Sequence, residues 1–256
     1  MQANIDPPIY TFLETLLTQI QLILGDKLVG LYLHGSLVMG DFDPTVSDID
    51  LLAALVSDLS AVEFATLDAM HHELVAQNPQ WEHRLEIAYL SLHGLQTFRT
   101  ESSPIGIISP GEPFHIIPAG RDWLVNWYAV REWGVPLFGP PAPTLIGPIA
   151  TDEFIQNIKD HTAHWHEWLK KDASRPAQAY AILTMCRAFY SCVFGEQVSK
   201  PRAAEWTMEV LPEWADLIQN ALKWRLAWRE PVTDPAATLP KTRHFVEFMQ
   251  QKIEEL

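Results

Sequence analysis

Hydrophobic residues are spaced differently in the two parts of this 256-residue chain. Up to residue 147, short apolar segments typical of strands alternate with segments whose apolar residues follow the spacing of an amphipathic helix. From residue 148 onward the helical spacing dominates. The pattern predicts an α+β protein, with a sheet and helices over residues 1–147 and a bundle of helices over residues 148–256.

The first part predicts three strands and three helices. Mainly apolar strands are expected over residues 28–34, 48–56 and 84–92. Helices are expected from Pro8 to Gly25, from the capping box Ser60-Ala-Val-Glu63 to about Asn78, and over residues 122–134. Residues 95–120 are rich in proline, glycine and serine, so we expect loops close to the site there, with Glu112 and His115 as unassigned polar residues.

The second part predicts five helices joined by short linkers. Residues 139–148, with four prolines, are expected to connect the two domains. The helices are expected to begin near Thr151, Pro176, Ser199, Leu211 and Lys241, the fourth ending at Trp228. His161, His164 and His166 lie on the first helix, but His166 points away from the other two, which favours a solvated face over a metal site. Trp165 and Trp168 are expected to pack in the core or between the domains, and stacking against a sugar ring of the acceptor is the alternative.

The stretch from Gly35 to Asp50 carries the candidate chemistry. Asp48 and Asp50 are two positions apart on an expected strand, so their carboxylates share one face. Two such carboxylates without a basic neighbour repel each other and suit a hard divalent cation such as Mg²⁺, although Asp-x-Asp alone also suits a solvated strand end. Gly35 lets the backbone approach a ligand closely, and the Ser36 hydroxyl with nearby amides can hold phosphate oxygens.

Glu86 is the one carboxylate inside the apolar segment of residues 84–92. Alternation along a strand places Glu86 on one face with Arg84 and Ala88. A glutamate in such a strand costs stability unless something binds it. An exposed strand edge or a pair with Arg84 would explain it, whereas two metal-binding aspartates nearby would favour a catalytic role.

The order Gly35-Ser36, spacer, Ser47-Asp48-Ile49-Asp50 resembles the pattern of the DNA polymerase β-like nucleotidyltransferase superfamily. Within it, the chain looks most like aminoglycoside nucleotidyltransferases of the streptomycin/spectinomycin adenylyltransferase type. The resemblance covers nearly the whole chain. It implies a nucleotidyltransferase domain with a mixed sheet, followed by an α-helical domain. It also implies ATP as co-substrate, Mg²⁺ on Asp48 and Asp50, and phosphate oxygens on Ser36 and Ser47. Leu85-Glu86-Ile87 matches a Leu-Glu-(Ile/Val) context in the family, which implies that Glu86 is the general base and can also touch the metal.

Three further candidates depend on the same resemblance. Asp122 opens a helix similar to one whose aspartate lies near the nucleotide in the family, and a helix N-cap is the structural alternative. Arg187 and Lys200 lie in segments similar to those whose cations reach the triphosphate. The structural alternatives are a bond from Arg187 to a carboxylate and a solvated Lys200 at a helix start, where a cation opposes the helix dipole.

Charge and composition narrow the choice of partners. A formal net charge of −14 argues against a nucleic-acid partner and suits a cationic small molecule. No apolar segment approaches the roughly 20 residues that span a bilayer, and the N-terminus does not resemble a signal peptide. We therefore expect no membrane partner and a cytoplasmic location. Cys186 and Cys192 suit neither a disulfide framework nor a zinc site.

Together these features predict Mg²⁺-dependent transfer of AMP from ATP to an acceptor hydroxyl, with release of pyrophosphate. The resemblance makes an aminoglycoside the expected acceptor. The chain departs from the family over residues 109–115, and Ala173 and Ala177 stand where acidic residues for the drug are expected. Two alternatives stay open. One is transfer to another hydroxyl, such as that of a toxin-like protein. The other is a nucleotide-binding module without catalysis, which the presence of all three carboxylates disfavours.

Overall fold

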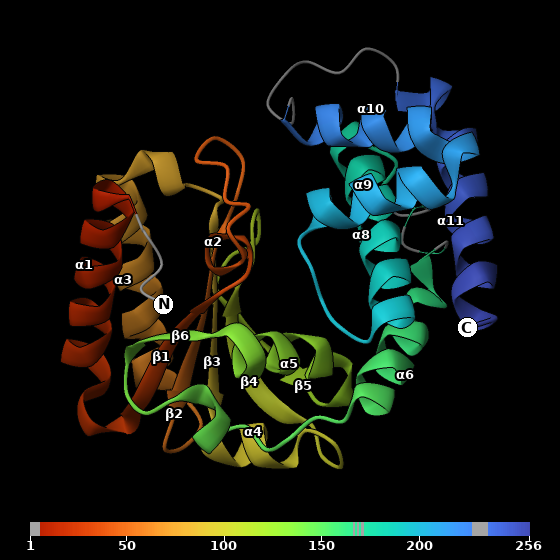
Figure 1. Ribbon diagram of the computed structural model, residues 1–256. Helices are drawn as coiled ribbons and strands as arrows, with labels where there is room; N and C mark the ends of the chain where they lie inside the picture. The colour runs from red at the N-terminus through yellow and green to blue at the C-terminus, as the bar shows by residue number, and fades with distance from the viewer. Residues whose placement is uncertain (1–5, 166, 168, 170–171, 227–234) are drawn as a thin grey trace. The chain divides into compact units, whose positions relative to one another are not determined.

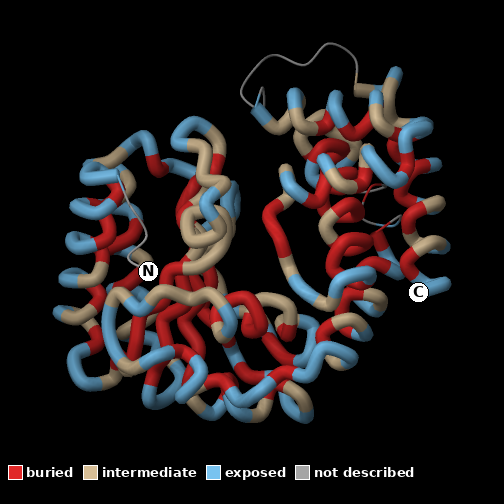
Figure 2. The backbone as a smooth tube through the Cα atoms, viewed as in Figure 1, coloured by how far each residue is buried: buried red, intermediate tan, exposed pale blue. Residues whose placement is uncertain are grey.

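The computed structural model describes residues 6–165, 167, 169, 172–226 and 235–256. The chain forms two compact units, Met1–Pro148 and Ile149–Leu256. The first unit holds all the strands described, and the second is helical (Figure 1). Each unit has its own buried residues (Figure 2).

Six strands of the first unit form one mixed sheet. They are β1 (Leu28–His34), β2 (Ile49–Leu55), β3 (Leu85–Ser91), β4 (Ser103–Ile108), β5 (His115–Ala119) and β6 (Val135–Phe138). Their order across the sheet is β5-β4-β3-β2-β1-β6. Strands β2 and β3 are parallel, and the other neighbouring pairs are antiparallel. The parallel pair needs a crossover connection, which contains a helix between β2 and β3.

Helices cover the two faces of this sheet. On one side lie α1 (Pro7–Leu24) and the crossover helix α3 (Ala61–Gln77), and on the other lie α4 (Leu92–Thr97) and α5 (Leu124–Trp133) (Figure 1). Because side chains alternate along a strand, every second residue of β1, β2 and β3 faces α1 and α3. These residues include Leu33, Leu51 and Ile87, and they form one core with apolar residues of α1. The intervening residues point to the opposite face.

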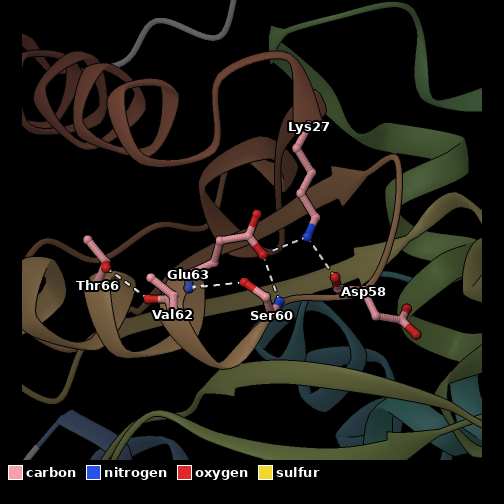
Figure 3. Close-up of polar contacts among 6 residues, drawn as sticks. All are labelled: Lys27, Asp58, Ser60, Val62, Glu63 and Thr66. Carbon is pink, nitrogen blue, oxygen red and sulfur yellow. Dashed lines mark hydrogen bonds and ion pairs between the residues drawn. The ribbon is translucent and has the colours of Figure 1, made fainter.

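Helix α3 begins at the capping box expected from the sequence. The Ser60 hydroxyl accepts a hydrogen bond from the Glu63 amide, and the Glu63 carboxylate accepts one from the Ser60 amide (Figure 3). Lys27 Nζ adds a 2.6 Å ion pair to Glu63 and a 2.7 Å hydrogen bond to the Asp58 carbonyl. Burial raises the pKa of Glu63, but the hydrogen bonds from Lys27 and Ser60 outweigh it, and the pKa falls to about 2. This cluster lies at the end of the sheet where β1 begins.

The second unit packs its helices around a central one. The helices are α6 (Thr151–Thr162), α8 (Arg175–Phe194), α9 (Lys200–Val210), α10 (Ala215–Leu226) and α11 (Leu239–Glu254). Helix α8 contacts α6, α9, α10 and α11, and most of its side chains are buried (Figure 2). A helix in contact with this many neighbours has little exposed surface, which explains why apolar residues occur around most of its circumference.

The α+β architecture expected from the sequence is confirmed, and the three expected strands correspond to β1, β2 and β3. The expectation of loops over residues 95–120 is wrong, because this segment contains the end of α4 and strands β4 and β5. Proline and glycine weaken its apolar pattern, yet β5 is an edge strand, where proline is tolerated.

Some of the residues with a predicted role or position are outside the ranges that the structure describes. His166, Trp168 and the expected helix end at Trp228 are outside the described residues. Within the described ranges, no helix is both long enough and apolar enough to cross a bilayer.

Candidate active site

Three polar side chains form a row across neighbouring strands of the sheet. Asp50 on β2 is paired in register with His34 on β1 and with Glu86 on β3. Residues directly opposite each other on adjacent strands present their side chains on the same face, with Cβ atoms about 5 Å apart. The row therefore lies on the face opposite α1 and α3. Asp48 is the residue immediately before β2, two positions ahead of Asp50, and continued alternation would place it on this face too.

Gly35 allows the Asp50 carboxylate to lie against the end of β1. Its φ angle of +69° is in the left-handed region that favours glycine. A Cβ atom at this position would stand only 2.6 Å from Asp50 Cγ. The sequence predicted that Gly35 lets the backbone approach a ligand, whereas the close approach that the structure shows is to the Asp50 carboxylate.

The two candidate serines have different surroundings. Ser36 is partly buried and begins the short helix α2 (Ser36–Met39) directly after Gly35. Ser47 is 2% exposed, and its hydroxyl accepts a 3.0 Å hydrogen bond from the Asp43 amide. Ser47 thus helps to shape the loop before Asp48, while Ser36 is the more accessible of the two expected phosphate ligands.

His34 belongs to the site but was not a candidate from the sequence. Burial lowers the pKa of its imidazole to about 4, so the ring is neutral near pH 7. A neutral imidazole can donate one hydrogen bond and accept another. The signal in the sequence is a polar residue that ends an apolar strand immediately before Gly35-Ser36.

The expected metal ligands supply carboxylate oxygens, the donors that Mg²⁺ prefers. Among the residues that the structure describes, no group of three or more His, Cys, Asp or Glu side chains could hold a metal ion. Mg²⁺ is usually bound by one or two protein carboxylates, with substrate phosphates and water completing its coordination. Asp48 and Asp50 fit this donor set, and Glu86 as a third ligand stays a prediction.

Asp122 lies in a 3-10 turn, Arg121–Trp123, that precedes α5. Its side chain is exposed and accepts a 2.9 Å hydrogen bond from the Gly120 amide. The N-cap of α5 is Trp123, without a side-chain cap. The alternative of Asp122 as the N-cap of a helix over residues 122–134 is therefore wrong, and its role near a nucleotide stays a prediction.

Arg187 and Lys200 belong to the second unit. Arg187 is partly buried on α8. Lys200 is the first residue of α9, which the Ser199 hydroxyl caps, and its Nζ lies 3.8 Å from the centroid of the Tyr180 ring. This cation–π contact corrects the alternative of a simply solvated lysine. The phosphate-binding role of Arg187 and Lys200 stays a prediction.

Comparisons with known proteins agree with this architecture. Residues 144–252 match the family "Aminoglycoside adenylyltransferase, C-terminal domain". An aminoglycoside (3'') (9) adenylyltransferase of Klebsiella pneumoniae is 26% identical over 269 residues, covering 96% of this chain and 96% of that protein. A spectinomycin 9-adenylyltransferase of Staphylococcus aureus is 29% identical over 126 residues, covering 48% of this chain and 45% of that protein.

A solved structure shares the fold over almost the full length. The crystal structure of spectinomycin adenyltransferase AAD(9) from Enterococcus faecialis, with ATP and spectinomycin, matches with a TM-score of 0.75 and 15% sequence identity. The match covers 96% of this chain and 99% of that chain. This match shows a shared fold, and over nearly its whole length the chain is similar in sequence to an aminoglycoside adenylyltransferase.

Proposed function

We propose that this protein transfers AMP from ATP to a hydroxyl group of an aminoglycoside of the streptomycin/spectinomycin type and releases pyrophosphate. The observation that carries the proposal is the in-register pairing of Asp50 with Glu86 on one face of the sheet, with Asp48 immediately before the strand that holds Asp50. The relatives named for aminoglycoside and spectinomycin adenylylation support the reaction class.

Each carboxylate has a distinct role in this proposal. Asp48 and Asp50 would hold Mg²⁺, which when bound neutralises charge on the triphosphate oxygens. Glu86 is the general base that removes the proton from the acceptor hydroxyl as its oxygen attacks the α-phosphorus. A bond forms between that oxygen and phosphorus, and the bond from the α-phosphorus to the bridging oxygen of the departing pyrophosphate breaks.

The remaining predicted residues bind ATP. Ser36 would donate a hydrogen bond to a phosphate oxygen, and Asp122 would contact the nucleotide. Arg187 and Lys200 would bind phosphate oxygens, because cations stabilise the charge that develops on departing pyrophosphate. Ser47, with its buried hydroxyl, would act mainly through the loop that presents Asp48.

The acceptor is expected to be cationic, since the protein carries a net charge of −14 and an acidic protein attracts cations. The chain departs from the family pattern at residues 109–115, Ala173 and Ala177, where contacts to the drug are expected. The identity of the drug therefore depends on the relatives and not on matching residues. An acceptor hydroxyl on a protein partner is the alternative that the test must separate.

Pyrophosphate release tests the proposal. The protein would be assayed with Mg-ATP over a panel of aminoglycosides that includes streptomycin and spectinomycin, with Glu86→Ala as the control. We expect release that depends on one of the drugs and falls at least about 10²-fold in the variant. Binding of ATP without release on any drug would reject the aminoglycoside acceptor, and drug-dependent release that Glu86→Ala leaves intact would reject the assignment of the base.

A further inference from the structure

We propose that Arg84 is a positioning residue that sets the direction of the Asp48 carboxylate. This inference depends on the proposed function, because it assumes that Asp48 holds the metal of a Mg-ATP complex. Arg84 was considered above only as a possible partner of Glu86. Its position relative to the loop before β2 indicates a different task.

The Arg84 side chain reaches the loop that leads into β2. It is 3% exposed. Its Nε and Nη2 atoms donate to the Ser47 carbonyl at 3.0 and 2.5 Å, and Nη1 donates to the Pro44 carbonyl at 2.9 Å. The planar guanidinium group offers five N–H donors in a fixed arrangement, so it can bind two carbonyl groups of one loop at once.

These contacts lie on both sides of Asp48. The Ser47 carbonyl that accepts from the guanidinium belongs to the peptide group immediately before Asp48. On the other side, the amide of Ile49 donates a 2.9 Å hydrogen bond to the Arg84 carbonyl. Arg84, the residue immediately before β3, therefore binds the peptide groups before and after Asp48, which limits the backbone rotations that could turn the Asp48 carboxylate.

Aromatic packing holds the guanidinium in place. Arg84 Cζ lies 4.9 Å from the centroid of the Trp81 ring. Trp81 is itself buried, and its ring centroid is 5.5 Å from that of Phe12 and 6.5 Å from that of Phe42. Nη1 also donates a 3.4 Å hydrogen bond to the Gln80 carbonyl. A guanidinium that lies over an aromatic ring and binds three carbonyls is poorly replaced by lysine, whose ammonium is not planar.

The competing interpretation is that Arg84 serves stability alone. Lys27 provides the matched comparison, because it is also a cation that bonds a loop carbonyl in the same unit (Figure 3). Lys27 lies at the opposite end of β1 and β2, since Leu28 pairs with Leu55 there and His34 pairs with Asp50 at the site. Loss of Lys27 should weaken the fold without changing the metal ligands.

ATP affinity measured with Mg²⁺ and with EDTA separates the two interpretations. Wild type, Arg84→Lys, Arg84→Met and Lys27→Met would be compared by calorimetry, with urea unfolding of each. We expect Mg²⁺ to tighten ATP binding to wild type and to Lys27→Met equally. In the Arg84 variants that Mg²⁺-dependent gain should fall by about 10–100-fold, as for residues that orient metal ligands. Arg84→Lys keeps the charge and much of the side chain, so it provides the test if Arg84→Met does not fold.

The outcomes distinguish the two proposals. A wild-type Mg²⁺-dependent gain that a folded Arg84 variant retains in full would overturn the role of Arg84 and leave the proposed function intact. The absence of such a gain in wild type would overturn the proposed metal site, and the role of Arg84 with it. An equal loss in Lys27→Met would show that lower stability alone causes the effect, which also overturns the positioning role.

Discussion

Lys27 and Arg84 bind loop carbonyls at opposite ends of the same sheet. Lys27 donates to the Asp58 carbonyl and pairs with Glu63 where β1 begins and β2 ends (Figure 3). Arg84 donates to the Ser47 and Pro44 carbonyls at the other end. The two clusters are roughly 20 Å apart along the strands.

The difference lies in what each cation holds. Lys27 fastens the loop that enters α3, and its partner Glu63 already belongs to a local capping box. Arg84 fastens the loop that presents Asp48 beside Asp50. Similar chemistry thus stabilises the fold at one end of the sheet and, in our proposal, aligns the reacting groups at the other. The role of a cation that binds a loop carbonyl therefore follows from the group that the loop carries.

Removal of a metal ligand should give the largest effect. Asp50→Asn takes away one of the two carboxylates proposed for Mg²⁺, and we expect Mg²⁺-dependent ATP binding and pyrophosphate release to fall by at least about 10²-fold. Asp26→Asn is the control, because Asp26 is an exposed aspartate at the Lys27 end of the sheet. Equal activity of the two variants would show that Asp50 is not a ligand.

A methyl group at Gly35 should harm both stability and activity. Gly35→Ala places a Cβ atom against the Asp50 carboxylate at a left-handed φ angle. Gly111→Ala has a similar positive φ angle of +83° but meets no atom within 4 Å, so it measures the backbone cost alone, about 1–2 kcal/mol. Urea unfolding and pyrophosphate release should both be impaired more in Gly35→Ala. If the two variants behave alike, the contact with Asp50 has no consequence.

Removal of the Lys27 cation, at the end of the sheet away from the candidate site, should lower only the stability of the fold. Lys27→Met removes the ion pair to the Glu63 carboxylate and the hydrogen bond to the Asp58 carbonyl, while the Ser60 amide still donates to Glu63. We expect a loss of about 1–2 kcal/mol in the free energy of unfolding, with the rate of AMP transfer per folded molecule unchanged. Urea unfolding together with the pyrophosphate assay measures both quantities. A lower transfer rate in fully folded Lys27→Met would contradict the claim that Lys27 affects stability alone.

The smallest effect should be the pH dependence at Glu63. Its pKa in the folded protein, about 2, is below its ordinary value of 4.5, so the ionised form stabilises the fold above pH 4.5. This stabilisation should decrease as the pH falls from 4.5 toward 2. Wild type should therefore exceed Glu63→Gln in unfolding free energy at pH 7, and the difference should shrink in acid. A difference that stays constant between pH 7 and pH 3 would argue against the ion pair.

The sequence predicted the elements whose signals are local. The capping box at Ser60 and Glu63 uses residues three positions apart, and the apolar strands β1, β2 and β3 need only their own side chains. The order Gly35-Ser36 after one apolar strand and Asp50 within the next predicted that these residues lie near each other, and the register of β1 with β2 places His34, next to Gly35, opposite Asp50.

Features that depend on distant partners were missed. Strands β4 and β5 have weak patterns and pair one after the other outward from β3, so they were expected to be loops. The bond from Arg84 to Ser47 joins residues 37 positions apart, and no local periodicity indicates it. His34 belongs to the candidate site because the register of β1 with β2 places it opposite Asp50, and that register is not visible in the sequence. In each case the tertiary arrangement supplies the information.

Detection of AMP on the acceptor tests the proposed reaction most directly. Wild type and Glu86→Gln would be incubated with streptomycin or spectinomycin and Mg-ATP labelled in its α-phosphate, after calorimetry has established that both proteins bind ATP. We expect labelled drug with wild type and at least about 10²-fold less in the same time with Glu86→Gln. Equal labelling by both proteins, or no label on either drug, would contradict the proposed reaction.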